Sequence, residues 1–334
     1  MNSSTRFVLG CAHSKMASSS IEKERRPTRV LDGSRVAVEI KREVAETVTL
    51  LNRVYGVSPR LAVVRVGDDQ ASEVYVRNKV RTSEEVGIKS EHFALPATTT
   101  IDELLELVTS LNNREEVDGI LVQLPLPGGM DSARVLEAID PAKDVDGFHP
   151  INVGRLAQGQ LALVPCTPAG IIELLIREGI EIEGARACVV GRSHIVGRPV
   201  AALLLQRNAT VTICHSFTRD LSSATSQADI LIAAIGRPAF IRGSHIKPGA
   251  IVVDVGMNKV TDEAAARALF NREEVERRVE TIRKRGYTLI GDVHPAEASE
   301  VAGALTPVPG GVGPLTVAML MRNTVDACRR RRGH

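Results

Sequence analysis

The stretch ACVVGRSHIVGRPVAALLLQRNATVTIC, residues 187–214, decides the fold class. An apolar strand runs into a glycine turn, which an apolar helix and a second β-branched strand follow. A unit of this kind presents backbone N–H groups and a helix N-terminus to a pyrophosphate. Ser193 replaces the second glycine of the usual G-x-G-x-x-G pattern, and such a turn is also found as a purely structural connection. The unit predicts a dinucleotide-binding loop at Gly191, Arg192 and Ser193.

The turn after the second strand indicates which dinucleotide binds. It reads HSFTR over residues 215–219, and no acidic residue of this turn precedes Asp220. Loops that prefer NAD place an Asp or Glu near this point to hold the ribose 2′-hydroxyl. Ser216, with the cations of Arg192 and Arg219, would instead favour a 2′-phosphate through charge-assisted hydrogen bonds. We therefore predict NADP as the cofactor, in preference to NAD.

Outward from this unit, short apolar runs alternate with helical patterns along most of the chain. This alternation predicts parallel strands with helices on both faces. The fold class expected is α/β, with two α/β domains, one of them a Rossmann-like doubly wound parallel sheet. A boundary is expected at 165–168, where Thr167 can cap and Pro168 can begin a helix over 168–178. The expected strands are residues 61–66, 119–124, 187–190, 210–214, 230–235, 251–255 and 288–290.

Composition excludes several classes of protein. The 334 residues are 43% hydrophobic and 25% charged, which suits a globular chain of about two domains. No apolar run approaches the ~18 residues of a membrane span. A net charge of +2 and the absence of Trp argue against nucleic acid as a partner. Five cysteines without paired spacing indicate reduced residues, no metal site and a cytoplasmic location.

Three charged or polar segments lie outside these patterns. Residues 1–28 are rich in serine and carry few acids, which fits either a disordered tail or a mitochondrial targeting segment. Residues 261–285 are charge-dense and amphipathic, typical of one solvated surface helix. The basic run Arg329–Arg332 is expected to end in solvent, where it complements a helix dipole.

A second group of polar residues falls on helix faces and at strand ends. Tyr75 and Lys79 are four residues apart and share a helix face, although this pairing is common on solvent-exposed helices. Gln123 closes an apolar strand, where α/β proteins bind ligands. Lys143-Asp-Val-Asp146-Gly forms a polar turn, for which turn capping by either aspartate is the ordinary interpretation. The Gly/Pro loop 306–316 would let backbone approach a flat ligand or serve as a rigid hinge.

Taken together, six segments resemble the bifunctional methylenetetrahydrofolate dehydrogenase/cyclohydrolase family, in its order and spacing, over about residues 30–328. KDVDGFHP and PVPGGVGP are the most specific of them. The segments are ASEVYVRNKVRTSEEVGI (71–88), DGILVQLPLP (118–127), PAKDVDGFHPINVGRL (141–156), PCTPAGIIELL (165–175), VVGRSHIVGRPVAALLL (189–205) and LTPVPGGVGPLTVAML (305–320).

The resemblance implies oxidation of 5,10-methylenetetrahydrofolate to 5,10-methenyltetrahydrofolate, then hydrolysis to 10-formyltetrahydrofolate. It makes Lys79 the acid/base group, Gln123 its partner, Tyr75 the ring that stacks on the folate and Asp146 the anchor of the pterin. These four are the expected catalytic residues. The expected folate-binding residues are Tyr75, Lys79, Gln123, Leu124, Asp146, Pro309, Gly310, Gly311 and Thr316. The expected NADP-binding residues are Gly191, Arg192, Ser193, Ser216 and Met257.

The resemblance also implies an organisation of the whole chain. A catalytic folate-binding domain would comprise residues 29–166 plus 312–334, an NADP-binding domain residues 167–311, and the substrate cleft would lie between them. A homodimer through the dinucleotide domain is expected. The alternatives are a dehydrogenase that has lost the cyclohydrolase step, a nucleic-acid-binding or scaffold protein that uses the C-terminal arginines, and a shikimate-type dehydrogenase.

Overall fold

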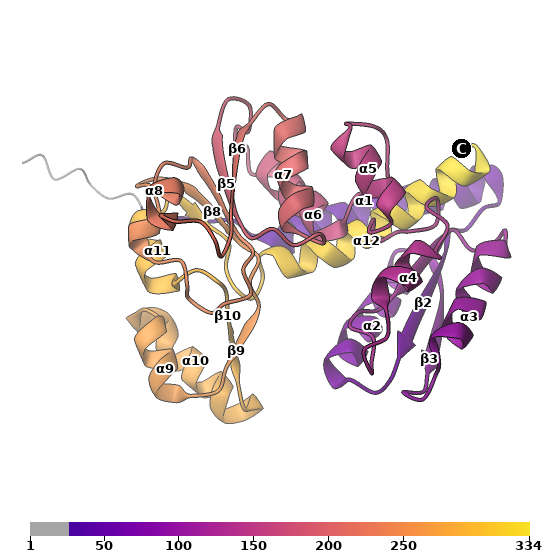
Figure 1. Cartoon of the computed structure of the whole chain (residues 1–334), viewed down its shortest axis with the longest axis horizontal. Coiled ribbons are helices and arrows are strands. Elements are labelled where there is room, and N and C mark those ends of the chain that lie inside the picture. The colour runs from indigo at the N-terminus through magenta and orange to yellow at the C-terminus, as the bar shows by residue number, and fades with distance from the viewer. Residues whose placement is uncertain (1–26) are drawn as a thin grey trace, which may run out of the picture.

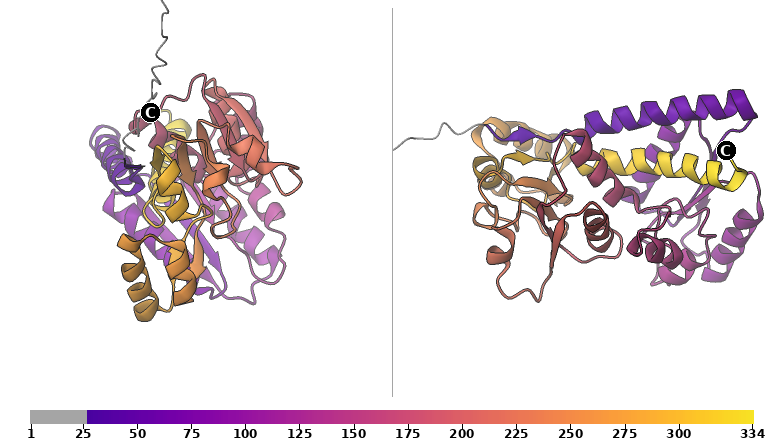
Figure 2. Two further views of the ribbon diagram at one scale, coloured as in Figure 1. Left: turned by 90° about the vertical axis from the view of Figure 1, so that its left-hand side faces the viewer. Right: turned by 90° about the horizontal axis from the view of Figure 1, so that it is seen from above.

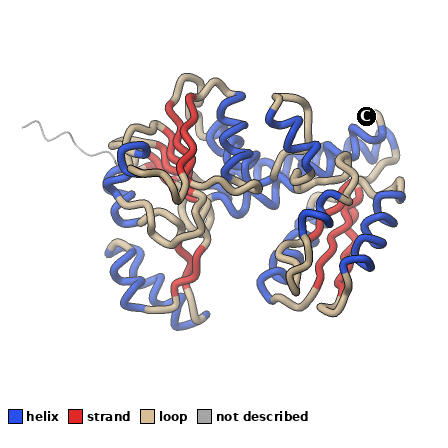
Figure 3. The backbone as a smooth tube through the Cα atoms, viewed as in Figure 1, coloured by secondary structure: helices blue, strands red, loops and turns tan. Residues whose placement is uncertain are grey.

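Two parallel β-sheets lie toward opposite ends of the molecule in the computed structural model, which describes residues 27–334 (Figures 1 and 3). Neighbouring strands in both sheets are parallel, so the predicted α/β fold class is confirmed. The smaller sheet has the order β3 (Lys89–Leu95), β2 (Arg60–Val66) and β4 (Gly119–Val122). The larger has the order β1 (Arg29–Val30), β11 (Ala304–Leu305), β8 (Ile251–Asp254), β7 (Ile230–Ala233), β5 (Arg186–Val190) and β6 (Thr210–Cys214).

Helices connect and cover these strands, and several begin at strong caps. Asp32 caps the first long helix, and Thr100 and Glu103 form a reciprocal capping box at the third. The helices are α1 (Gly33–Tyr55), α2 (Gln70–Glu85), α3 (Ile101–Asn113), α4 (Ser132–Glu137), α5 (Pro150–Ala157), α6 (Cys166–Arg177), α7 (Gly197–Gln206), α8 (Leu221–Thr225), η1 (Gly243–His245), α9 (Glu263–Leu269), α10 (Arg272–Arg285), α11 (Pro295–Val301) and α12 (Val312–Arg332).

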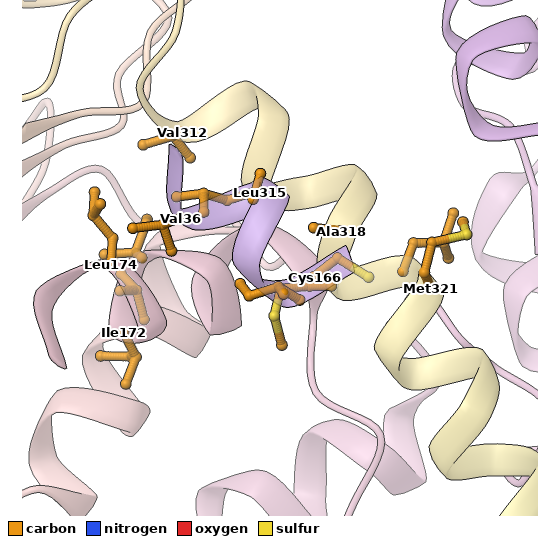
Figure 4. Packing of buried hydrophobic residues seen from close by; sticks show 14 of the residues in the cluster. Val36, Cys166, Ile172, Leu174, Val312, Leu315, Ala318 and Met321 are labelled. Carbon is orange, nitrogen blue, oxygen red and sulfur yellow. The ribbon is translucent and has the colours of Figure 1, made fainter. Parts of the chain in front are cut away.

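Helices α1, α6 and α12 form the apolar link between the two sheets. Figure 4 shows Val36, Leu174 and Leu315 meeting there from the three helices, and each is fully buried. Gly170 of α6 lets α12 approach closely, because a Cβ at Gly170 would lie 2.7 Å from the Cβ of Leu315. Burial of each large aliphatic side chain contributes about 1.5–3 kcal/mol, so this link is rigid rather than a loose linker.

The last helix lies alongside the first over its whole length. Figure 2 shows α1 and α12 side by side in the view from above. At one end Gly33 abuts Gly311, and at the other the ring of Tyr55 stacks on His334 with centroids 4.1 Å apart. The C-terminal segment therefore ends beside the small sheet, although the residues that precede it belong to the large one.

Two expectations about local structure are wrong. Thr167 does not cap a helix: α6 begins at Cys166 after Pro165, with no side-chain cap, and the Thr167 hydroxyl instead lies 2.8 Å from that of Thr316. Strand β10 (Thr288–Ile290) is outside the parallel sheets, since it pairs antiparallel with β9 (Asn258–Val260). The sequence of so short a strand does not encode which partner it takes.

The segment 261–285 is also not one solvated helix. It folds into α9 and α10, because Asn271 caps a new helix by accepting a hydrogen bond from the Glu274 backbone N–H. The two helices bury Ala266, Phe270, Val279 and Ile282 in a small core against the β9–β10 pair. This unit lies below the large sheet in Figure 1.

The C-terminal arginines do not simply end in solvent. Arg331 and Arg332 both bind the carboxylate of Asp118, which is fully buried, at 2.9 and 2.8 Å. The same carboxylate accepts a hydrogen bond from the Arg60 backbone N–H. These contacts fasten the end of α12 to the small sheet.

Substitution Arg332→Ala should destabilise the protein by about 2 kcal/mol, because a buried carboxylate loses one of its two cations. Urea unfolding followed by circular dichroism measures this as a lower midpoint with an unchanged slope. Arg330→Ala is the matched control, since Arg330 is exposed, and it should stay within about 0.5 kcal/mol of the parent. Equal midpoints for the two variants would contradict the role given to the Asp118 pair.

No helix in the described part of the chain is long and apolar enough to cross a membrane. Residues 1–26 lie outside the described residues, and with them nearly all of the segment expected to be a tail or a targeting signal.

Candidate active site

A cavity of about 430 Å³ lies between the two sheets and collects residues from both. Among its lining residues are Tyr75, Lys79, Gln123, Leu124, Asp146, Met257 and Thr316. A second cavity, of about 260 Å³, shares Tyr75 and Met257 with the first and is also lined by Pro309, Gly310 and Gly311. The structure thus brings the nine expected folate-binding residues and Met257 into two adjoining cavities.

Lys79 is the central cation of the larger cavity, and it is only 8% exposed. Its Nζ donates a hydrogen bond of 3.0 Å to the side-chain oxygen of Gln123. The amide nitrogen of Gln123 donates in turn to the Leu124 carbonyl at 2.7 Å, which fixes the oxygen toward the lysine. The helix face and the strand end predicted from the sequence therefore meet as one hydrogen-bonded pair.

The turn that carries Asp146 is built by its neighbours. Asp144 is the turn cap: it accepts hydrogen bonds from the backbone of Gly147 and His149 and from the Asn152 side chain. Gly147 has φ +75°, and a Cβ there would lie 2.5 Å from the Pro165 nitrogen. Lys143, which is buried, donates to three backbone carbonyls at the end of α3. Both aspartates were candidates for capping, and the structure assigns capping to Asp144.

Asp146 instead faces the cavity. Burial raises the pKa of its carboxyl group, the nearby Lys79 ammonium opposes that rise, and Asp144 adds to it. Within the described residues no hydrogen bond satisfies this carboxylate. The carboxylate is half-buried and has no donor from the protein, so it can accept hydrogen bonds from a ligand with N–H groups.

Tyr75 bridges the two halves of the molecule. Its hydroxyl lies 3.3 Å from the sulfur of Met257, which follows strand β8 of the large sheet. The ring is 41% exposed within the cavity, and burial raises the pKa of its hydroxyl, with a further rise from the nearby Tyr287. An aromatic face in this position can stack on a flat ligand that contacts both lobes.

The loop before α12 is held from two sides. The backbone N–H of Ser34 donates to Gly310 O at 3.0 Å, and a Cβ at Gly33 would lie 1.7 Å from Gly311 O. On the other side, the buried guanidinium of Arg278 donates to Val308 O at 2.8 Å. The sequence allowed this loop either to approach a flat ligand or to act as a rigid hinge. In the structure these contacts hold it as a fixed wall of the cavity.

The turn after β5 approaches its neighbours closely. Gly191 has φ +128°, and a Cβ there would lie 2.1 Å from Ala234 O. A Cβ at Gly197 would lie 2.2 Å from Gly191 O, so both ends of the turn require glycine. The hydroxyl of Ser193 accepts hydrogen bonds from the backbone of Val196 and Gly197 at 3.2 and 3.3 Å. The helix N-terminus and its backbone amides lie where the sequence places a phosphate site.

The turn after β6 carries Ser216, which is exposed, and the guanidinium of Arg192 lies 5.7 Å from the ring of Phe217. Asp220, the first acid beyond the strand, accepts a hydrogen bond from Ser223 N and caps α8. It is therefore committed to the helix rather than to a ribose. Arg192 thus places one cation beside the turn that carries Ser216, which favours a 2′-phosphate there.

Two buried aspartates behind this region were missed by the sequence analysis. Asp254 accepts hydrogen bonds from the backbone of Gly256, Asp292 and Val293, and burial raises its pKa to about 7. Asp292 accepts from the backbone of Ile235 and Gly236. The pair shapes the loops at the carboxyl ends of β7 and β8. Their signal in the sequence was a pair of short segments of the same composition, DVG from residue 254 and GDV from residue 291, which is weak without the structure.

Two family models match nearly the whole described chain. The model described as tetrahydrofolate dehydrogenase/cyclohydrolase, catalytic domain, matches residues 31–146. The corresponding NAD(P)-binding domain matches residues 165–332. Among curated proteins, the bifunctional protein FolD of Koribacter versatilis is 56% identical over 305 residues, which cover 91% of this chain and 98% of that protein.

Solved structures show the same likeness. The bifunctional enzyme FolD, methylenetetrahydrofolate dehydrogenase/cyclohydrolase, of Campylobacter jejuni superposes with a TM-score of 0.82 at 43% identity, covering 91% of this chain and 99% of that one. The Trypanosoma brucei N5,N10-methylenetetrahydrofolate dehydrogenase-cyclohydrolase, complexed with NADP cofactor and an inhibitor, gives 0.81 at 39% identity, covering 92% and 99%.

Proposed function

The chain belongs to the tetrahydrofolate dehydrogenase/cyclohydrolase family, and from that premise we propose that it catalyses both reactions of a bifunctional folate enzyme. It oxidises 5,10-methylenetetrahydrofolate to 5,10-methenyltetrahydrofolate with NADP, and it hydrolyses the product to 10-formyltetrahydrofolate. The observation that carries this proposal is the hydrogen-bonded pair Lys79–Gln123, which shares one cavity with Asp146, Tyr75 and Met257.

The oxidation does not require a strong acid or base catalyst from the protein. The reacting methylene stands between two nitrogens, whose lone pairs stabilise the cation that forms when hydride leaves. When bound, NADP supplies the hydride acceptor. The protein positions the folate: Asp146 accepts from the pterin's N–H edge, and Tyr75 stacks on its rings. A near-attack geometry is then the main source of rate.

The hydrolysis needs proton management. Water adds to the C=N⁺ carbon of the methenyl cation and loses one proton, which leaves a neutral carbinol. The carbinol hydroxyl then loses its proton as the formyl C=O forms, the C–N bond to the ring nitrogen breaks, and that nitrogen takes up a proton, so that one proton is released overall. Lys79 lies in the cavity with its Nζ on Gln123, in reach of both events. Gln123 holds the ammonium in place as a positioning partner, and Lys79 transfers the protons. Leu124, Thr316 and the loop Pro309–Gly311 enclose the folate.

The residues near the β5 and β6 turns fit a bound NADP. Gly191, Arg192 and Ser193 would hold its phosphates with the backbone amides that begin α7, and Met257 would border the nicotinamide. Ser216 and the Arg192 guanidinium would take the 2′-phosphate, because charge-assisted hydrogen bonds favour an anion there.

We expect kcat/KM for NADP to exceed that for NAD by about tenfold or more, because one or two hydrogen bonds to the charged 2′-phosphate stabilise bound NADP by that factor. Ser216→Asp should invert this preference, because an acid repels the 2′-phosphate and accepts from a ribose hydroxyl. Initial rates at varied NADP and NAD measure both ratios. The matched control Ser222→Asp changes charge on α8, outside the turn, and should keep the preference. A higher kcat/KM for NAD in the parent enzyme would refute the choice of cofactor.

A dehydrogenase that has lost the second reaction remains the runner-up. The intact pair Lys79–Gln123 and the bifunctional relatives speak against it.

We further propose that residues 29–166 plus 312–334 form the folate-binding domain and residues 167–311 the NADP-binding domain. The two separate sheets support this division, although β1 joins the larger one. We also propose a homodimer through strand β6, which ends its sheet without a second neighbour among the described strands. Ile213 and Leu205, which are 42% and 65% exposed, add an apolar surface beside it. The four cysteines within the described residues are free and buried, which supports a reducing, cytoplasmic setting.

A further inference from the structure

Asp292 is a fully buried residue whose carboxylate connects three segments at the carboxyl edge of the larger sheet. Its Oδ2 accepts hydrogen bonds from the backbone N–H groups of Ile235 and Gly236, at 2.6 and 2.8 Å. Its Oδ1 accepts from the side-chain amide of Asn258 at 3.0 Å. Because Asp292 itself follows β10, one side chain joins the loop after β7, the start of β9 and the end of β10.

The neighbours of Asp292 fix the position of its carboxylate. The Asp292 backbone N–H donates to the buried Asp254 carboxylate at 2.8 Å, and the Asp292 carbonyl accepts from the Ile241 N–H at 2.9 Å. Gly256 packs directly against the carboxylate, because a Cβ there would lie 2.3 Å from Asp292 Oδ1. A carboxylate fixed in this way determines where its hydrogen-bond donors lie.

The first of its partner segments lies beside the cofactor turn. Ile235 and Gly236 directly follow Ala234, and a Cβ at Gly191 would lie 2.1 Å from the Ala234 carbonyl oxygen. The loop after β7 therefore packs against the turn that is expected to hold the dinucleotide. By binding the backbone of Ile235 and Gly236, Asp292 fixes the surface against which that turn rests.

The second partner segment carries Met257. This residue immediately precedes Asn258, lines both substrate cavities and places its sulfur 3.3 Å from the hydroxyl of Tyr75. Asn258 begins β9, and its bond to Asp292 holds that strand at its first residue. The wall between the folate and the nicotinamide is thus tied to the same carboxylate as the loop beside the cofactor turn.

We propose that Asp292 is a positioning residue for hydride transfer, which sets the distance between the nicotinamide and the reacting methylene of the folate. This inference rests on the proposed function, because it needs NADP at the Gly191 turn and folate against Tyr75. Near-attack geometry places reacting atoms about 3–3.5 Å apart, and a misplacement of about 1 Å can lower a rate by about 100-fold. Asp292 is fully buried and acts through Met257 and the loop after β7.

The hydrolysis does not depend on this arrangement. Lys79 lies on α2, Gln123 directly follows β4, and Asp146 lies in the turn at 143–147, all on the small-sheet side of the cavity. Water, and not the nicotinamide, reacts with the methenyl carbon. Loss of the Asp292 contacts should therefore separate the two reactions, whereas a general loss of structure would lower both.

Asp292→Ala should lower kcat of the dehydrogenase reaction by roughly 100-fold, while hydrolysis of purified 5,10-methenyltetrahydrofolate stays near the parent rate. The KM for NADP should change much less than kcat, because the turn that begins at Gly191 keeps its own sequence. With a substrate deuterated at the methylene carbon, the variant should show the full isotope effect of hydride transfer on kcat, since that step becomes the slowest. Initial rates of the two reactions measure each of these effects.

Asn258→Ala is the milder variant, because it leaves Asp292 and its two backbone partners in place. It should lower the dehydrogenase kcat by roughly fivefold to tenfold, as expected for one lost hydrogen bond, and again leave hydrolysis near the parent rate. The matched control is Asp229→Ala. It removes a carboxylate that binds Arg186 and Lys247 at the amino-terminal edge of the same sheet, and it should keep the parent ratio of the two activities.

Equal losses of both activities in Asp292→Ala and in Asn258→Ala would show a merely structural role and would overturn the proposal. A dehydrogenase kcat at the parent value in Asn258→Ala, or slow oxidation by Asp292→Ala without an isotope effect, would overturn it as well. If circular dichroism shows that Asp292→Ala does not fold, the ratio of activities in Asn258→Ala decides. Failure of the proposed function would look different, since the parent enzyme would then not oxidise 5,10-methylenetetrahydrofolate with NADP.

Discussion

Lys79→Met should lower the rate of 5,10-methenyltetrahydrofolate hydrolysis by roughly 10²- to 10⁴-fold, the usual contribution of general acid–base catalysis. Methionine keeps most of the length and apolar stem of lysine but carries no exchangeable proton. It also leaves the Gln123 oxygen without its donor and removes the cation that opposes the raised pKa of Asp146. Decay of purified methenyl substrate, followed by absorbance, measures the loss.

Lys89→Met is the matched control, because Lys89 begins β3 on the surface of the same lobe. It should hydrolyse the methenyl substrate at the parent rate. Circular dichroism spectra that agree among the three proteins would exclude unfolding as the cause. Hydrolysis by Lys79→Met at the parent rate would remove Lys79 from the reaction and with it the assignment of roles in the cavity.

Gly191→Ala should destabilise the protein by about 3 kcal/mol or more and lower its affinity for NADP by at least roughly 100-fold. The added Cβ would lie 2.1 Å from Ala234 O, and the φ of +128° is one that L side chains rarely adopt. The turn can relieve that clash only by moving away from β7, and the backbone amides at the start of α7 move with it. Urea unfolding and a titration with NADP measure the two effects.

Gly236→Ala is the matched control, since Gly236 also has a positive φ, +72°, but a Cβ there meets nothing within 4 Å. Its cost should be that of the backbone conformation alone, about 1 kcal/mol. If the two variants lost stability and NADP affinity equally, close packing at Gly191 would not be what shapes the loop.

Much of the fold follows from local sequence. Strands β6 and β10 have the predicted bounds, and β2, β5, β7 and β8 differ from them by one or two residues. Buried parallel strands are continuous runs of β-branched residues between Gly, Pro or polar residues. This pattern can be recognised without knowing which strand pairs with which. Strand β3 was missed because its residues alternate between partly and well exposed, as is usual for an edge strand.

The candidate site was readable in part for the same reason. Tyr75 and Lys79 share a helix face, and Gln123 ends a strand, so each position is set by local periodicity. That the three meet Asp146 and Thr316 in one cavity depends on tertiary packing. The choice between Asp144 and Asp146 as turn cap likewise depended on which of them faced the cavity.

Long-range polar contacts could not be predicted from the sequence. Asp118 and Arg332 are 214 positions apart, and no local sequence pattern at either residue predicts their ion pair. The break of residues 261–285 into two helices depends on Asn271 as a cap, which competes with a charge pattern that continues across it. Such polar side chains form hydrogen bonds with groups that become buried on folding, so their partners can be identified only in the folded chain.

The most direct test of the account is one absorbance trace of the parent enzyme supplied with 5,10-methylenetetrahydrofolate and NADP. The account predicts that 5,10-methenyltetrahydrofolate rises and then decays to 10-formyltetrahydrofolate, as one cavity performs both reactions. Methenyl product that forms and then decays no faster than it does without enzyme would contradict the bifunctional assignment. No turnover with either NADP or NAD would contradict the function as a whole.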